Sequence, residues 1–278
     1  MIGLCTDSNA QLPPALVDRY GVEVVPITVT IDGVDYAEGV DLDADTFYAR
    51  FAGGATPQVS TAQPSPGRFA EAYQRLADRG ASEIISIHVS AAVSGTLNSA
   101  RLAARDAPVK VHLVDSGTAS FGIGCCVWEA AEALASGATV RESIEVAQTL
   151  ARTIGNVFVV GALNLVRQGG RLDAGSSPSS DDVPVLSLVD GKVKVIATAS
   201  DLEAATVMMA AYVQAWGTGL KVAIGVADRA GAPLSDALDA ALSNATEVRE
   251  LLRYRIGPSV GVHTGPGTAG AFFFPTAG

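Results

Sequence analysis

Short apolar runs alternate with stretches of helical period through the first half of this chain. Strands are predicted at residues 2–5, 23–31, 83–89 and 109–114. Helical patterns follow Pro13-Pro14 and Phe121 and occur at 44–51, 66–78, 96–105 and 140–153. A strand, a crossover helix and another strand at this spacing form a parallel sheet, with the helices packed on its faces. The first half is therefore predicted to be a parallel three-layer α/β/α domain.

The pattern changes after residue 156. VFVVGAL from Val157 is predicted to be a strand, and VPVLSLVDGKVKVIATA contains two alternating runs joined by Asp190-Gly191, a pair that favours an antiparallel hairpin. Further helices are predicted at 202–214 and 234–242, and further strands at 221–227 and 247–253. The second half is therefore predicted to be an α/β domain with a mixed sheet, so the domains are 1–156 and 157–278.

Composition narrows the class of protein. Hydrophobic residues are 48% of the 278 residues but aromatic residues only 6%, so Ala, Val, Ile and Leu must build the core. The net charge is -10, without a run of Lys or Arg, which argues against nucleic acid and against docking on anionic lipid. Apolar runs such as 157–166 are shorter than the ~18 residues of a membrane span, and MIGLCTDSN lacks the basic segment of a signal peptide. We expect a soluble cytoplasmic protein.

Cysteine and histidine suggest no metal site. Cys5, Cys125 and Cys126 are an odd number, which suits buried thiols better than disulfides. The three histidines lie far apart, without the spacing of metal ligands, and no phosphate-binding loop with its Lys is present. No metal and no cofactor are predicted.

The segment ISIHVSAAVSGTLNSA passes from an apolar run into a helical pattern at Ser94. Ser94 is predicted to be the N-cap, with the amide of Gly95 among the unpaired N–H groups of the first turn. Such a terminus attracts an anion through its amides and the helix dipole. Ser94 and Gly95 are therefore candidate carboxylate ligands, and the alternative is a plain cap that satisfies only its own helix.

Thr61 lies in VSTAQPSPG, where three prolines restrict the backbone. This predicts a stiff loop, followed by a helix with Ser65 as N-cap and Pro66 at its first position. A rigid loop can present the Thr61 hydroxyl to a ligand. The alternative is that Thr61 bonds only within its own turn.

Two further candidates are Arg171 and His263. Arg171 follows Gly169 and Gly170, a flexible loop that can bring a guanidinium to an anion in bidentate geometry, although a surface ion pair is the alternative. His263 lies in a glycine-rich turn and can donate to an oxyanion, or can be a structural residue.

Two apparent motifs near the C-terminus are interpreted as accidental. Residues 257–261 fit G-x-S-x-G, but no Asp follows Asp239 and His263 comes only four residues after the serine. Residues 265–270 fit G-x-G-x-x-G without the downstream βαβ unit and acid of a dinucleotide fold. Hydroxyls and helix amides without a paired acid and base are typical of a binding site rather than a hydrolase.

Taken together, short segments spread over almost the whole chain resemble the DegV family in their order and spacing. They are TDS at 6–8, VPITVTIDG from Val25, STAQPSPG from Ser60, ISIHVS from Ile85, SGTLNSA from Ser94, VDSGTAS from Val114, QGGR from Gln168, VDGKV from Val189 and IGPSVGVHTGPG from Ile256. The resemblance implies the two-domain EDD architecture and a bacterial fatty-acid carrier that is not itself an enzyme. In such carriers the acyl chain is buried in one domain and its carboxyl group lies at the domain interface.

The resemblance also implies residue roles and a partner. Thr61 and Ser94 would bind the carboxyl group of a long-chain fatty acid, with Arg171 and His263 nearby. The partner would be the ATP-binding subunit of a fatty acid kinase, which makes an acyl phosphate on the carrier. Two departures stand out: the segment after Arg171 is shorter and more polar than in relatives, and no basic residue lies between Lys194 and Lys221, where relatives carry Arg and Lys.

Two other functions remain open at this point. One is a lipid esterase or thioesterase that uses Ser94 or Ser259 with His263. The other is a binder of a small phosphorylated or polyol ligand, since the two-domain outline resembles that of dihydroxyacetone kinase subunits.

Overall fold

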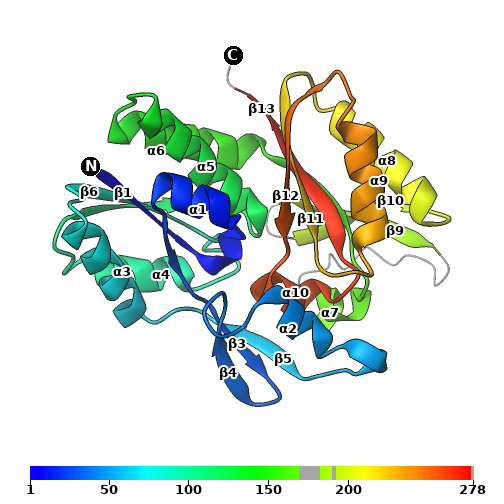
Figure 1. Ribbon diagram of the computed structural model, residues 1–278, viewed down its shortest axis with the longest axis horizontal. Coiled ribbons are helices and arrows are strands. Elements are labelled where there is room, and N and C mark those ends of the chain that lie inside the picture. Colours follow the sequence, from blue (N-terminus) through cyan, green and yellow to red (C-terminus); the bar gives the residue numbers. More distant parts are fainter. Residues whose placement is uncertain (169–181, 190–191, 277–278) are drawn as a thin grey trace. The chain divides into compact units, whose positions relative to one another are not determined.

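The computed structural model describes residues 1–168, 182–189 and 192–276 (Figure 1). The chain divides into two compact units. The first unit comprises Met1–Asp43 and Pro57–Arg152, and the second comprises Ala44–Thr56 and Thr153–Gly278. The segment 44–56 therefore leaves the first unit, folds with the second and returns.

A four-stranded parallel sheet in the order β2-β1-β6-β7 forms the centre of the first unit. Its strands are β1 (Ile2–Asp7), β2 (Glu23–Val25), β6 (Glu83–His88) and β7 (Lys110–Asp115). After their first residues, the two central strands β1 and β6 are buried along their whole length, as parallel strands between two helical layers must be. The parallel α/β fold predicted for the first half is confirmed.

Helices cover both faces of this sheet. They are α1 (Pro14–Tyr20), α3 (Pro66–Asp78), α4 (Thr96–Ala104), α5 (Phe121–Ala135) and α6 (Val140–Thr153), with a short 3-10 helix η1 (Ser8–Ala10) after β1. Figure 1 shows α3 and α4 on one face and α5 and α6 on the other. Helix α3 begins as predicted, because Ser65 Oγ accepts from the amide of Arg68 and Pro66 occupies the first helical position.

The prediction of one strand over residues 23–31 is wrong. The parallel strand ends at Val25, because Pro26 lacks the N–H that a sheet ladder requires. Beyond it, β3 (Thr28–Ile31) pairs with β4 (Val34–Ala37) and β5 (Val59–Ala62) in a separate three-stranded antiparallel sheet. Asp32 and Gly33 join β3 to β4 with positive φ angles of 49° and 82°, as in a type I′ turn. Thr61, predicted in a loop, lies in β5.

The second unit contains a six-stranded mixed sheet in the order β10-β9-β8-β13-β11-β12, which confirms the predicted mixed α/β character. Its strands are β8 (Gly155–Val159), β9 (Val183–Val189), β10 (Lys192–Ala199), β11 (Leu220–Val226), β12 (Val248–Arg255) and β13 (Ala269–Pro275). Strands β9 and β10 pair antiparallel, as predicted, with Lys192 opposite Val189. The turn residues Asp190 and Gly191 lie outside the described residues. Strand β13 was not predicted.

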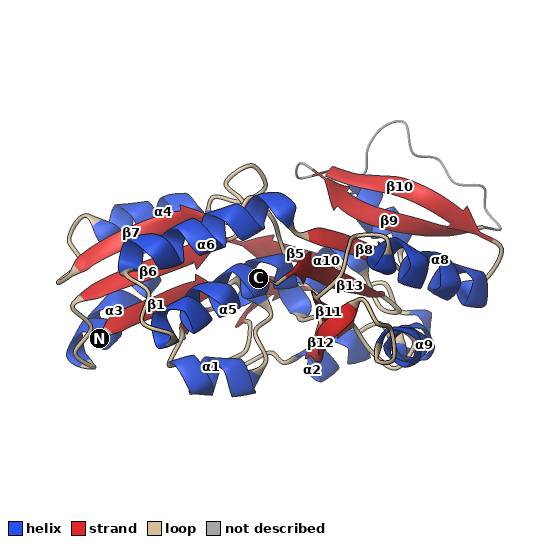
Figure 2. Ribbon diagram, turned by 90° about the horizontal axis from the view of Figure 1, so that it is seen from above, coloured by secondary structure: helices blue, strands red, loops and turns tan. Residues whose placement is uncertain are grey.

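The helices of the second unit are α2 (Ala44–Ala49), α7 (Leu163–Gln168), α8 (Leu202–Gln214), α9 (Ala232–Leu242) and α10 (Pro258–Thr264), with a 3-10 helix η2 (Ala52–Gly54). Helices α8 and α9 bury their apolar residues in one core cluster with the sheet and lie on the same face of it (Figure 2). Helix α2 packs beside α10, where Gly261 leaves room for two aromatic rings. A methyl group at Gly261 would lie 2.7 Å from Phe47 Cε1 and 2.6 Å from Tyr48 Oη.

No helix among the described residues is both long and apolar enough to cross a bilayer. All three cysteines are buried, as predicted. Desolvation raises the pKa of Cys5 and of Cys126 to about 12, so both are protonated, unreactive thiols at neutral pH.

Candidate functional site

The loop after β6 carries Ser94 and Gly95 to the start of α4. The N-cap of α4 is Gly95, so the prediction that Ser94 occupies this position is wrong by one residue. Ser94 Oγ nevertheless accepts from the amide of Thr96 at 3.2 Å and hydrogen-bonds Thr96 Oγ1 at 2.9 Å. The Ser94 hydroxyl therefore serves its own helix in this structure. Within the described chain, the Gly95 amide donates to no acceptor.

Thr61 reaches the same region through its strand. In β5 it pairs with Val29 of β3 and is half-buried. Gln63 follows at the end of the strand, and its side-chain amide lies against Gly95, within 2.8 Å of where a β-carbon would be. The segments that carry Thr61 and Ser94, which are more than thirty residues apart in the printed sequence, therefore meet at the start of α4. Sequence reasoning did not find Gln63.

A buried polar network lies beneath this region. Asp7, at the carboxyl end of β1, accepts from three donors: the amides of Asn9 and Val89, each at 3.1 Å, and His88 Nδ1 at 2.9 Å. Asn9 Oδ1 in turn accepts from the amide of Ser120 at 2.9 Å. The network thus connects the loops that follow β1, β6 and β7. Loops at the carboxyl ends of parallel strands are where α/β folds place their ligands.

The same network extends inward from His88. His88 Nε2 lies 2.6 Å from Ser86 Oγ, which lies 3.0 Å from the Tyr73 hydroxyl. Burial raises the pKa of Tyr73, so its phenol stays protonated. Ser86, His88 and Asp7 have the bonding order of a hydrolase triad. All three are 0% exposed, so no substrate carbonyl reaches Ser86 Oγ.

Arg171 and His263 are placed differently. Arg171 lies outside the described residues. His263, predicted in a glycine-rich turn, lies in the last turn of α10 and is half-buried. Ser259 lies in the first turn of that same helix and is 2% exposed, so G-x-S-x-G here is not the strand-to-helix elbow that presents a nucleophile. The described residues contain no group of three His, Cys, Asp or Glu side chains that could hold a metal.

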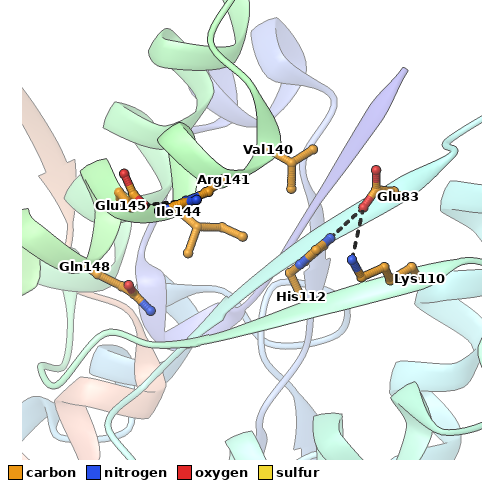
Figure 3. Close-up of a pocket in the computed structure, with 8 residues that line it drawn as sticks. All are labelled: Glu83, Lys110, His112, Val140, Arg141, Ile144, Glu145 and Gln148. Carbon is orange, nitrogen blue, oxygen red and sulfur yellow. Dashed lines mark hydrogen bonds and ion pairs between the residues drawn. The ribbon is translucent and has the colours of Figure 1, made fainter.

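A pocket of about 460 Å³ lies at the opposite end of the parallel sheet, near the amino ends of β6 and β7 (Figure 3). Its charged groups are already paired with one another. His112 Nε2 contacts Glu83 Oε2 at 2.6 Å, Lys110 lies 3.9 Å from the same oxygen, and Arg141 contacts Glu145 at 2.8 Å. Neither Thr61 nor Ser94 lines this pocket, so it is separate from the predicted head-group residues.

The Glu83 contact predicts a pH dependence of stability. The hydrogen bond from His112 lowers the pKa of Glu83 below its ordinary value of 4.5, with Lys110 adding a smaller effect. A carboxyl whose folded pKa is lowered stabilises the fold above its unfolded pKa, and this contribution is lost as the pH falls through the folded pKa. We therefore expect the unfolding free energy to fall less steeply in Glu83→Gln than in the unaltered protein between about pH 5 and pH 3. Urea titrations at each pH measure this slope, and Glu71→Gln, on the exposed side of α3, is the control. Equal slopes in all three proteins would contradict the expectation.

Comparison with known proteins covers nearly the whole chain. The sequence profile described as "Uncharacterised protein, DegV family" matches residues 1–276. A DegV domain-containing protein of Streptomyces coelicolor is 34% identical over 97% of this chain and 96% of its own. Among solved structures, a Thermus thermophilus DegV family protein described for its fatty acid binding has a TM-score of 0.88 at 31% identity, over 99% of both chains. A fatty acid binding DegV family protein from Streptococcus agalactiae has a TM-score of 0.85 at 25% identity, over 100% of this chain and 99% of that one. The protein therefore belongs to the DegV family.

Proposed function

We propose that this protein binds a long-chain fatty acid and acts as a carrier, without catalysing a reaction alone. The acyl chain is buried, and Thr61, Ser94 and Gly95 hold the carboxyl group. The observation that carries the proposal is the meeting of the Thr61 and Ser94 segments at the start of α4, where the Gly95 amide has no acceptor in the described chain. The fatty acid binding of the Thermus and Streptococcus relatives supports the same ligand class.

The energetics suit a carrier. Burial of an acyl chain contributes about 0.8 kcal/mol per methylene, on the order of 10 kcal/mol for a long chain before ordering costs. The head group then needs orientation more than affinity. Hydroxyl and amide donors orient a carboxylate without removing its charge, so one oxygen keeps its nucleophilic character. In the proposal, Arg171 and His263 complete the head-group site.

A carboxylate presented in this way suits transfer of a phosphoryl group by a partner. In the proposed reaction a carboxylate oxygen attacks the γ-phosphorus of ATP held by a kinase subunit, ADP leaves, and an acyl phosphate forms on the carrier. Helix α8 lies in the region of the sequence where the resemblance to the DegV family implies basic residues. Here it has neither Lys nor Arg, and Leu202, Val207 and Met208 are 45%, 65% and 40% exposed. A kinase that docks on α8 would therefore meet apolar side chains and the carboxylate of Glu203 rather than positive charge.

Mass spectrometry of the untreated recombinant protein, native and then after solvent extraction, tests the ligand class directly. We expect a co-purified long-chain fatty acid in near-stoichiometric amount, because the buried tail makes dissociation slow. The delipidated protein should take up added palmitic acid. A protein that is empty as purified and also ignores added fatty acids would overturn the proposal and favour a small polar ligand.

A further inference from the structure

The backbone geometry of Gly95 does not require a glycine. Its φ of -78° and ψ of 1° are accessible to every L-amino acid. The neighbours that a β-carbon at Gly95 would approach most closely are the amide atoms of a single side chain, first Gln63 Oε1 and then Cδ at 2.7 Å and Nε2 at 2.8 Å. The missing side chain at Gly95 thus leaves room for the Gln63 amide against the N-cap of α4.

The fold does not use the polar atoms of this amide. Within the described chain, neither Gln63 Oε1 nor Nε2 takes part in a hydrogen bond with another residue, and Gln63 is exposed. Its backbone is nevertheless restrained, since Gln63 follows the last residue of β5 and precedes Pro64. A side-chain amide therefore lies beside the start of a helix with its donors and acceptor available.

We propose that Gln63 selects the head group of the ligand, by donating from Nε2 to an oxygen of the bound carboxylate. The inference rests on the proposed fatty-acid function and adds a residue to it. An uncharged amide suits this role, because it donates to an ionised carboxylate without adding a charge that would hold the acid as a tight ion pair. Gly95 contributes indirectly. Because it has no side chain, the Gln63 amide can occupy the space beside the N-cap of α4.

The replacement of Gln63 by glutamate gives a sharp test, because it changes charge and hydrogen bonding with little change of shape. A carboxylate at residue 63 repels a ligand carboxylate and loses the donor. It does not endanger the fold, since negative charge near a helix N-terminus is stabilising. Gln58→Glu is the matched control, because Gln58 is exposed and immediately precedes β5.

The experiment measures direct binding of palmitic acid and of hexadecanol, its alcohol of equal chain length, to each delipidated protein near neutral pH. Gln63→Glu is expected to weaken palmitate binding at least about tenfold and to leave hexadecanol binding within about twofold, because a charged hydrogen bond is lost and repulsion is added. Gln63→Ala and Gly95→Ala should weaken palmitate binding in the same direction, and Gln58→Glu should change neither ligand.

The outcomes separate this inference from the function on which it rests. If the unaltered protein binds no palmitate, the fatty-acid function fails and the role of Gln63 fails with it. If the unaltered protein binds palmitate and Gln63→Glu binds it equally well, only the role of Gln63 is overturned. An equal loss of both ligands in Gln63→Glu and Gln63→Ala would also overturn it, because selection of the head group requires the acid and the alcohol to respond differently.

Discussion

Asp7→Asn is expected to lower the unfolding free energy by about 1–3 kcal/mol, the usual cost of leaving a buried hydrogen-bond donor without its acceptor. Asp7 is 0% exposed, and its two carboxylate oxygens accept from His88 Nδ1 and from the amides of Asn9 and Val89. An asparagine at this position replaces one acceptor oxygen with an NH₂ group. At least one of the three donors would then face another donor in the core, without access to water.

Urea unfolding followed by circular dichroism measures this loss. Asp18→Asn, on the exposed side of α1, makes the same chemical change at the surface and should shift stability by no more than about 0.5 kcal/mol. A loss below about 1 kcal/mol for Asp7→Asn would mean that the network beneath the candidate site does not hold the loops after β1 and β6.

Replacing Thr61 and Ser94 together by alanine is expected to weaken fatty-acid binding about 10- to 100-fold, the effect of losing hydrogen bonds to a carboxylate. Folding should survive. Thr61 is half-buried, and the loss of the Ser94 bond to the Thr96 amide costs about 0.5–2 kcal/mol, as for other helix-capping residues. Ligand occupancy by mass spectrometry and urea unfolding of the same samples separate the two effects.

Ser60→Ala is the control for this pair, because adjacent residues of a strand face opposite sides and Ser60 precedes Thr61 in β5. It should bind fatty acid normally. Normal occupancy in the double variant would move the head-group site away from the start of α4.

Elements with strong local patterns could be predicted from the sequence. Helices α3, α6 and α8 have the predicted limits, because caps, proline and helical periodicity mark their ends without help from distant residues. The antiparallel sheet of the first unit was missed, although Asp32-Gly33 is the same type of turn pair as Asp190-Gly191. The apolar run continues across Pro26 and conceals the break between β2 and β3, because a proline between two short strands resembles an irregularity within a single strand. Strand β13 was missed because AGAFFFP has no alternation when both faces are buried.

The candidate site could be predicted only in part, for a related reason. The loop containing Ser94 was recognisable because a strand pattern runs directly into a helix pattern. The contact between Gln63 and Gly95 joins two distant segments, and no local pattern records it. The hydrogen bond between Asp7 and His88 likewise joins two distant segments, which are more than eighty positions apart in the sequence. The roles of Arg171 and His263 stay predictions.

The path of segment 44–56 has a consequence for the modularity of the protein. The chain passes between the two units three times, after Asp43, after Thr56 and after Arg152, so no single cut releases either unit intact. A fragment that starts at Thr153 would lack α2 and uncover the side of α10 at Gly261, where Phe47 and Tyr48 pack. To exchange the second unit between relatives, recombination or design therefore has to transfer residues 44–56 as well, which lie within the first half of the sequence.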